Sequence, residues 1–197
     1  VSIPEEGIIY RYPTPQSLQL CLPIQEGRRH YLGHIDLLGN RLFSKEELLT
    51  VTRLKPGNFF SPQAVEEATE AIQDHYGKKG YLDTAVKAHQ RPAAQPDTLD
   101  LHFSISEGKE IYVESVKISG NTKTKSRVIL REVSVLPGDV FDMVQVKASE
   151  QRLRSTRYFN DVTLTAEEIN VPGRRNLNIS VKEGQTGGVS FGGAFNT

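Results

Sequence analysis

The sequence has little of what many binding sites and membrane anchors need. Its single cysteine, Cys21, excludes an internal disulfide framework and a cysteine-based metal cluster. Its 24 basic and 24 acidic residues cancel, so no net charge draws the 197-residue chain toward nucleic acid. It also lacks an apolar run of about 18 residues, the length of a membrane-spanning helix. The remaining composition, 37% apolar and 24% charged, is typical of one or two folded domains.

The two ends of the sequence indicate a piece of a longer protein. The chain begins at Val1 without a charged and then apolar leader, and residues 187–197 stop within an alternating pattern. We therefore expect the parent protein to continue beyond Thr197.

An internal repeat is the most informative feature of the sequence. Five features recur 81 positions apart: Gly39-Asn40 and Gly120-Asn121, Pro56-Gly57 and Pro137-Gly138, Phe60 and Phe141, Val65 and Val146, and Ile72 and Leu153. The closing segments 101–108 and 177–184 match at an offset of 76, and both end in Glu-Gly. A shorter hairpin in the second copy accounts for the difference.

The closing pattern occurs a third time, near the start of the chain. Leu18, Leu20, Leu22 and Ile24 occupy alternate positions before Glu26-Gly27. We expect residues 1–27 to be the tail and last strand of a preceding, truncated repeat.

Each complete unit is predicted to have the order βααββ. Residues 35–37 alternate in polarity and stop at Gly-Asn, as a short strand before a turn would. Ser44 with Glu47 has the form of a capping box, and Ser61-Pro62 that of a second helix start; Asp142 and Gln145 take this role in the second unit. A hairpin of residues 82–90 and 99–106 follows. Three strands with one apolar face, covered by two helices, predict a two-layer α+β unit.

Candidate catalytic and metal-binding groups are weak. His30 and His34 flank a strand start, where residues four apart lie about 13 Å from each other. Glu66, Glu67 and Glu70 fall on the polar face of a predicted helix. We therefore predict a protein that is not an enzyme and has neither a cofactor nor a metal site.

Several motifs together resemble those of one family. They are Gly120-Asn121, Arg131-Glu132, Pro137-Gly138-Asp139, the segment Tyr158 to Val162, and the closing segment Val181 to Gly184. These resemble the POTRA repeats of BamA-type outer-membrane β-barrel assembly factors, and residues 188–193 resemble the first strand of that family's barrel. The resemblance implies tandem POTRA repeats at residues 28–108 (penultimate) and 109–184 (last, barrel-proximal), with the barrel starting at 185–197.

The resemblance also implies a function. Such a region would lie in the periplasm, bind unfolded outer-membrane protein clients, and pass them to the barrel for insertion into the outer membrane. Accessory lipoproteins are further partners that it allows, whereas nucleic acid is not expected.

In the family's fold the second strand of each sheet is an edge, whose unpaired N–H and C=O groups can accept an extended segment by β-augmentation. The client-binding residues expected on these edges are Leu82, Thr84, Val86, Ala88, Val162, Thr163, Leu164 and Ala166. An edge blunted by neighbouring loops is the alternative.

Two further sites are predicted. Glu107, Gly108 and Lys109 form a very short link, which we expect to act as an inter-repeat hinge of restricted orientation. Basic residues near turns could contact lipid headgroups, with solvated turns as the alternative: Lys123, Lys125, Arg127, Arg174 and Arg175.

Three other functions stay open on the sequence. POTRA repeats also occur in two-partner secretion and translocation-and-assembly transporters, although the former typically carry only two repeats. A soluble periplasmic scaffold would need Thr197 to lie near a natural terminus. A hydrolase would need histidines or carboxylates clustered in a pocket.

Overall fold

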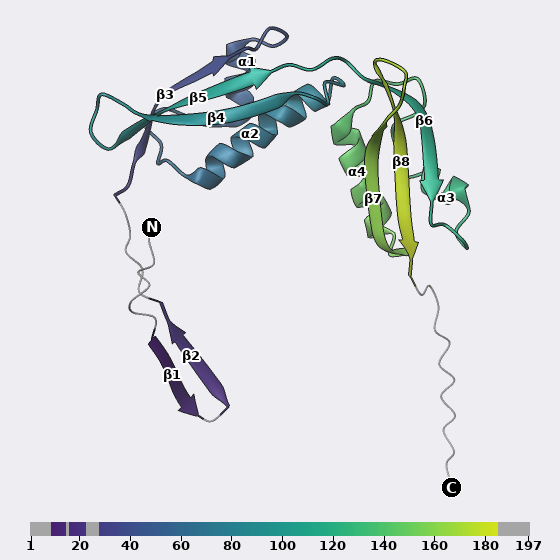
Figure 1. Ribbon diagram of the computed structural model, residues 1–197, viewed down its shortest axis with the longest axis horizontal. Helices are drawn as coiled ribbons and strands as arrows, with labels where there is room; N and C mark the ends of the chain where they lie inside the picture. The colour runs from purple at the N-terminus through teal and green to yellow at the C-terminus, as the bar shows by residue number, and fades with distance from the viewer. Residues whose placement is uncertain (1–8, 15, 23–27, 185–197) are drawn as a thin grey trace.

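The structure is a computed structural model that describes residues 9–14, 16–22 and 28–184. It contains two βααββ units in succession, preceded by a short hairpin (Figure 1). The hairpin pairs β1 (Ile9–Thr14) with β2 (Ser17–Cys21) in antiparallel fashion. The α+β architecture predicted from the sequence is thus confirmed.

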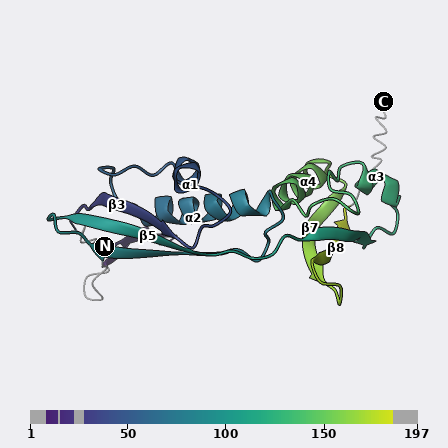
Figure 2. The ribbon, with the colours of Figure 1, turned by 90° about the horizontal axis from the view of Figure 1, so that it is seen from above.

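The first unit is a three-stranded sheet covered by two helices. Its elements are β3 (Tyr31–Leu38), α1 (Lys45–Thr52), α2 (Pro62–Gly77), β4 (Ala85–Pro92) and β5 (Thr98–Ser106). The strand order is β3-β5-β4, with β5 in the centre, parallel to β3 and antiparallel to β4. Figure 2 shows α1 and α2 together on one side of this sheet.

The second unit repeats this topology. Its elements are β6 (Tyr112–Ser119), α3 (Ser126–Leu130), α4 (Met143–Ser155), β7 (Phe159–Glu168) and β8 (Arg174–Glu183). The strand order is β6-β8-β7, again with the last strand in the centre. In both units the strand that precedes the last one therefore lies at the edge of its sheet.

Each unit has its own apolar core between the helices and one face of the sheet. In the first unit Leu101, Phe103 and Ile105 of β5 are buried, while Ser104 and Ser106 between and after them are exposed. They meet the apolar stripe of α2, which includes the fully buried Ile72. Leu177, Ile179 and Val181 do the same in the second unit. Such burial of apolar surface is the main driving force for folding.

The helix starts follow the predicted caps. Ser44 Oγ accepts a hydrogen bond from the Glu47 N–H at 3.1 Å, and Ser61 Oγ accepts one from Ala64 at 3.4 Å. The carboxylate of Glu47 contacts His75 at 2.9 Å instead of completing the capping box. In the second unit, Asp142 accepts the N–H groups of both Val144 and Gln145.

The repeated Gly-Asn and Glu-Gly signatures meet in space. Glu107 accepts hydrogen bonds from the N–H groups of Arg41 and Leu42, at 2.7 and 2.9 Å, just after the Gly39-Asn40 turn. Glu183 contacts the equivalent loop of the second unit, where it accepts the Thr124 N–H at 2.6 Å. Each closing glutamate thus fixes the loop after the first strand of its own unit.

The two units are in direct contact. The Ile111 N–H donates to the Gly80 carbonyl at 3.0 Å, and Lys147 of α4 pairs with Asp74 of α2 at 2.7 Å. Leu82, in the turn between α2 and β4, packs against the core of the second unit. These contacts connect the units through backbone, charged and apolar groups.

Among the described residues, no helix has both the length and the apolar character needed to cross a membrane. The hairpin at the start of the chain carries several exposed apolar side chains, with Tyr10 59% and Leu18 58% exposed. The sequence did not predict β1. The predicted strand from Leu18 to Ile24 corresponds to β2, which ends at Cys21; Ile24 lies outside the described residues.

Candidate functional site

Each sheet has two edge strands, and the candidate site is the outer edge of β4 in the first unit and of β7 in the second. Backbone groups of alternate residues in an edge strand point toward the neighbouring strand or away from it. The backbone groups of Val162 and Leu164 point away from β8. The Val162 carbonyl and the Leu164 N–H bond side chains of α4 instead. The register places Val86 opposite Ile105 as it places Val162 opposite Val181. Val86 and Ala88 therefore present their N–H and C=O groups to the free edge of β4.

Six of the eight predicted residues lie in the edge strands: Val86 and Ala88 in β4, and Val162, Thr163, Leu164 and Ala166 in β7. The side chains of all except Thr163 point to the core: Val86 is 7%, Val162 1% and Leu164 4% exposed. Thr163 lies between Val162 and Leu164, so its backbone groups point toward β8. Only its side chain faces solvent.

Leu82 and Thr84 do not belong to the edge, and this part of the prediction is wrong. β4 begins at Ala85, because the Thr84 N–H is held in a turn by the Tyr81 carbonyl at 3.3 Å. Leu82 is turned toward the second unit, where it contacts that unit's core. The prediction placed both residues in the strand because the sequence alternates in polarity there. Such a pattern does not reveal a contact with another unit.

The five predicted lipid-facing basic residues do not form one surface. Lys123, Lys125 and Arg127 lie in and around the loop after β6, beside Glu183 at the far end of β8. Arg174 and Arg175 lie at the opposite end of β8, where Arg174 pairs with Glu114 at 2.7 Å. Arg175 is 15% exposed and bonds Asp83 of the first unit at 2.9 Å, so it serves the contact between units.

The predicted hinge residues make contacts of their own. Besides fixing the Arg41–Leu42 backbone, Glu107 accepts a hydrogen bond from the buried Tyr76 hydroxyl at 2.7 Å. Gly108 approaches Asp83 so closely that an added Cβ would lie 3.0 Å from the Asp83 Cβ. Lys109 is exposed.

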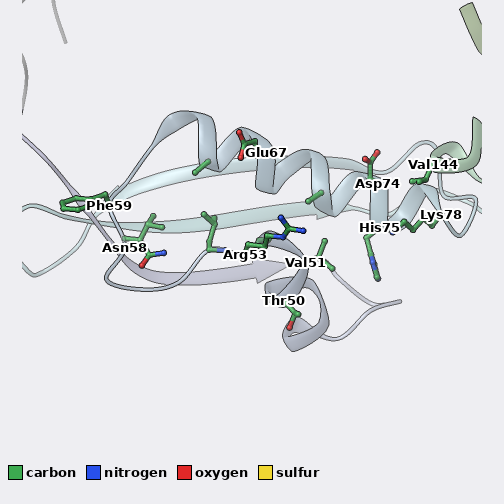
Figure 3. Close-up of a pocket in the computed structure, with 15 residues that line it drawn as sticks. Thr50, Val51, Arg53, Asn58, Phe59, Glu67, Asp74, His75, Lys78 and Val144 are labelled. Carbon is green, nitrogen blue, oxygen red and sulfur yellow. Dashed lines mark hydrogen bonds between the residues drawn. The ribbon is translucent and has the colours of Figure 1, made fainter. Parts of the chain in front are cut away.

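A cavity of about 610 Å³ lies between α1 and α2 in the first unit and is lined by polar and apolar side chains. Figure 3 shows Glu67 and Asp74 pointing to one side of α2 and His75 to the other. Each has its own partner: Glu67 bonds Gln63, Asp74 pairs with Lys147, and His75 contacts Glu47. These groups do not converge as a nucleophile and its base would. Within the described ranges, no group of three or more potential metal ligands occurs either.

Comparison with known proteins agrees with this architecture. A family model described as "POTRA: Surface antigen variable number repeat" matches residues 30–108 and 111–184. The outer membrane protein assembly factor BamA of Nitratidesulfovibrio vulgaris is 27% identical over 201 residues, which cover all of this chain and 24% of that protein. BamA of Neisseria meningitidis is 28% identical over 180 residues, which cover 90% of this chain and 22% of that protein. The chain therefore spans less than a quarter of the length of these relatives.

Solved structures show the same fold. The POTRA3-5 segment of Haemophilus influenzae BamA superposes with a TM-score of 0.74 and 20% identity, covering 92% of this chain and 72% of that one. BamA of Haemophilus ducreyi lacking POTRA domains 1-3 gives a TM-score of 0.67 at 21% identity, covering 81% and 30%. The chain belongs to the POTRA family, as a periplasmic POTRA region homologous to that of BamA outer-membrane protein assembly factors.

Proposed function

We propose that the chain binds extended segments of unfolded outer-membrane proteins on a free sheet edge and passes them on for insertion into the outer membrane. The observation that carries the proposal is the strand order β3-β5-β4, which pairs β4 with β5 on one side and places its other side at an edge of the sheet. The BamA relatives are outer membrane protein assembly factors, which supports this choice of client.

Backbone pairing suits a protein that must accept many sequences. An added strand bonds mainly through its N–H and C=O groups, so affinity depends little on the client's side chains. At β4 the groups available include those of Val86 and Ala88, and by the same alternation those of Gln90. Outer-membrane strands alternate apolar and polar residues. A strand of that pattern, added beside β4, would extend both faces of the sheet. Its apolar residues would continue the face that packs against α2, and its polar residues the solvent-exposed face that carries Lys87 and His89.

A proline at Ala88 tests this proposal. Its N–H faces the free edge, so Ala88→Pro removes an edge donor while the bonds to β5 remain, the condition under which strands tolerate proline. We expect a labelled peptide of alternating valine and threonine, flanked by lysines, to bind about tenfold or more weakly, as loss of a backbone contact of about 1.4 kcal/mol implies. Fluorescence anisotropy measures the affinity.

The matched control is Lys87→Ala, which shortens an outward side chain on the same strand and keeps its backbone. Its affinity should stay near that of the wild type. Equal affinity for the wild type and Ala88→Pro, with an unchanged circular-dichroism melting curve, would contradict β-augmentation at β4.

The segments flanking the two units extend the proposal. We propose that residues 1–27 end a preceding repeat, because the β1–β2 hairpin exposes apolar side chains that the helices of such a repeat would cover. Residues 109–184 are then the barrel-proximal repeat. The predicted barrel strand at 185–197 lies outside the described residues. Accessory lipoproteins remain proposed partners without assigned residues.

A lipid contact is proposed for Lys123, Lys125 and Arg127 alone, since these exposed residues share one end of the second sheet. Basic groups near an anionic surface contribute about 1 kcal/mol each to membrane binding. Reversing all three charges should reduce co-sedimentation with vesicles that contain phosphatidylglycerol. Unchanged co-sedimentation would contradict the contact.

A further inference from the structure

The free edges of β4 and β7 differ, although the two units share one topology. On β7, the Val162 carbonyl accepts a hydrogen bond from the Arg154 guanidinium of α4. The Leu164 N–H lies 3.4 Å from Glu150 Oε2 of the same helix. The Val162 N–H is held by the carboxylate of Asp161 at 2.9 Å. Three successive backbone groups that would bond an incoming strand are therefore already occupied by side chains.

The side chains that occupy the β7 edge form a connected group. Arg154 bonds Glu150 at 2.9 Å and Asp161 at 3.2 Å, so it bridges the helix and the start of the strand. The Arg154 side chain is 44% exposed. It can swing into water without opening the core, which makes this cover removable.

The other end of the β7 edge faces the first unit. Ala166 lines a cavity of about 250 Å³ together with Leu82, Thr84 and Met143. Arg175, which pairs with Glu168 at the end of β7, also bonds Asp83 of the first unit. An incoming strand would meet these groups as it extended along β7.

Among the described residues, the β4 edge has no such cover. The repeat places Thr69 and Gln73 of α2 where α4 carries Glu150 and Arg154. The Thr69 hydroxyl donates to the Val65 carbonyl of its own helix at 2.8 Å. In the part of the chain that the structure describes, no side chain hydrogen-bonds the free-edge groups of Val86 or Ala88.

We infer that β4 is the acceptor edge for an extended polypeptide strand, and that the Glu150–Arg154 pair holds the β7 edge closed. This inference rests on the proposed function and gives the two units different roles in it. An incoming strand pairs with β4 directly. It pairs with β7 only after Arg154 has left the Val162 carbonyl.

Amide hydrogen exchange of the 197-residue chain, followed by NMR with and without the valine-threonine peptide, tests this division. The peptide should slow exchange of the Val86 and Ala88 N–H groups by about tenfold or more and leave Val162 and Leu164 unchanged, since exchange reports which groups are paired. Glu150→Ala/Arg154→Ala frees the Leu164 N–H and the Val162 carbonyl and should add protection at Leu164. The control Glu114→Ala/Arg174→Ala removes another exposed ion pair of the same unit away from β7 and should not.

The reciprocal variant Thr69→Glu/Gln73→Arg places the pair on α2. It should reduce the protection that the peptide gives at Val86 and Ala88, and it tests the inference even if the Glu150/Arg154 variant fails to fold. Wild-type protection at Val162 and Leu164 equal to that at Val86 and Ala88 would overturn the closure and leave the proposed function standing. Protection at neither edge, in wild type and variants alike, would overturn the proposed function itself.

Discussion

At the scale of single residues, the signatures that reveal the repeat also act as structural contacts. Gly39 and Gly120 have φ of +92° and +85°, and a Cβ on Gly120 would lie 1.9 Å from the Val181 carbonyl oxygen. Glutamates 107 and 183 bind the loop that follows each of these glycines. The sequence showed that Gly-Asn and Glu-Gly recur together. It could not show that they touch, because about sixty residues separate them within each unit.

Gly120→Ala should destabilise the second unit, because both the left-handed φ and the carbonyl oppose a Cβ. Gly138→Ala is the matched control, since Gly138 has φ of +93° and nothing within 4 Å of its added Cβ. We expect a loss of about 1 kcal/mol for the control and at least about 2 kcal/mol more for Gly120→Ala. Urea denaturation measures both. Equal losses would show that the loop yields to the methyl group.

Glu183 makes the stability of the second unit depend on pH. The Thr124 N–H, followed by the Thr122 hydroxyl, lowers the pKa of Glu183 from 4.5 to about 2. Because the folded pKa is depressed, the carboxylate stabilises the fold above about pH 4.5, and this contribution is lost as pH falls toward 2. Glu183→Gln should therefore lower the urea midpoint at pH 7 and flatten its fall between pH 4.5 and 2.

The control for Glu183 is Glu66→Gln, an exposed residue of α2. Its urea midpoint should follow that of the wild type across the same pH range. A Glu183→Gln midpoint that falls as steeply as the wild type would contradict the assignment to Glu183.

At the scale of elements, the sequence predicts best where pattern alone decides structure. The alternation from Leu101 to Ile105 and the cap at Ser61 were both correct. The start of β4 and the cover on β7 were not predictable. Leu82 packs against the core of the neighbouring unit. Arg154 of α4 bonds the Val162 carbonyl of β7, across the turn between helix and strand. Tertiary contacts of this kind override local preference.

Asp142 provides a test at the scale of the helix. Its Oδ1 accepts the N–H groups of Val144 and Gln145 at 2.9 and 3.0 Å, which would otherwise be unpaired at the start of α4. Asp142→Ala should cost about 1 kcal/mol of unfolding free energy, whereas Asp142→Asn keeps an acceptor and should cost little. Denaturant titration distinguishes them, and equal losses would exclude the cap as the cause.

At the scale of the whole molecule, the contacts between units limit how the two sheets can turn. Gly80, with φ of +82°, lets the backbones approach: an added Cβ would lie 2.9 Å from the Ile111 carbonyl oxygen and 2.7 Å from Val140. Two ion pairs, Asp74 with Lys147 and Asp83 with Arg175, flank this approach. The sequence predicted a restricted link from its shortness at Glu107 to Lys109. These contacts, which come from α2 and the turn after it, add to that restriction.

Small-angle scattering of the wild type should therefore fit a narrow range of orientations between the two units. Asp83→Ala/Lys147→Ala removes one partner of each ion pair and keeps the hydrogen bond from Ile111 to Gly80, so it should broaden that range without unfolding either unit. Arg174→Ala, which breaks a pair inside the second unit, is the control and should scatter like the wild type. Scattering of the wild type that required freely independent units would show that these contacts do not hold in solution, since exposed ion pairs are individually weak.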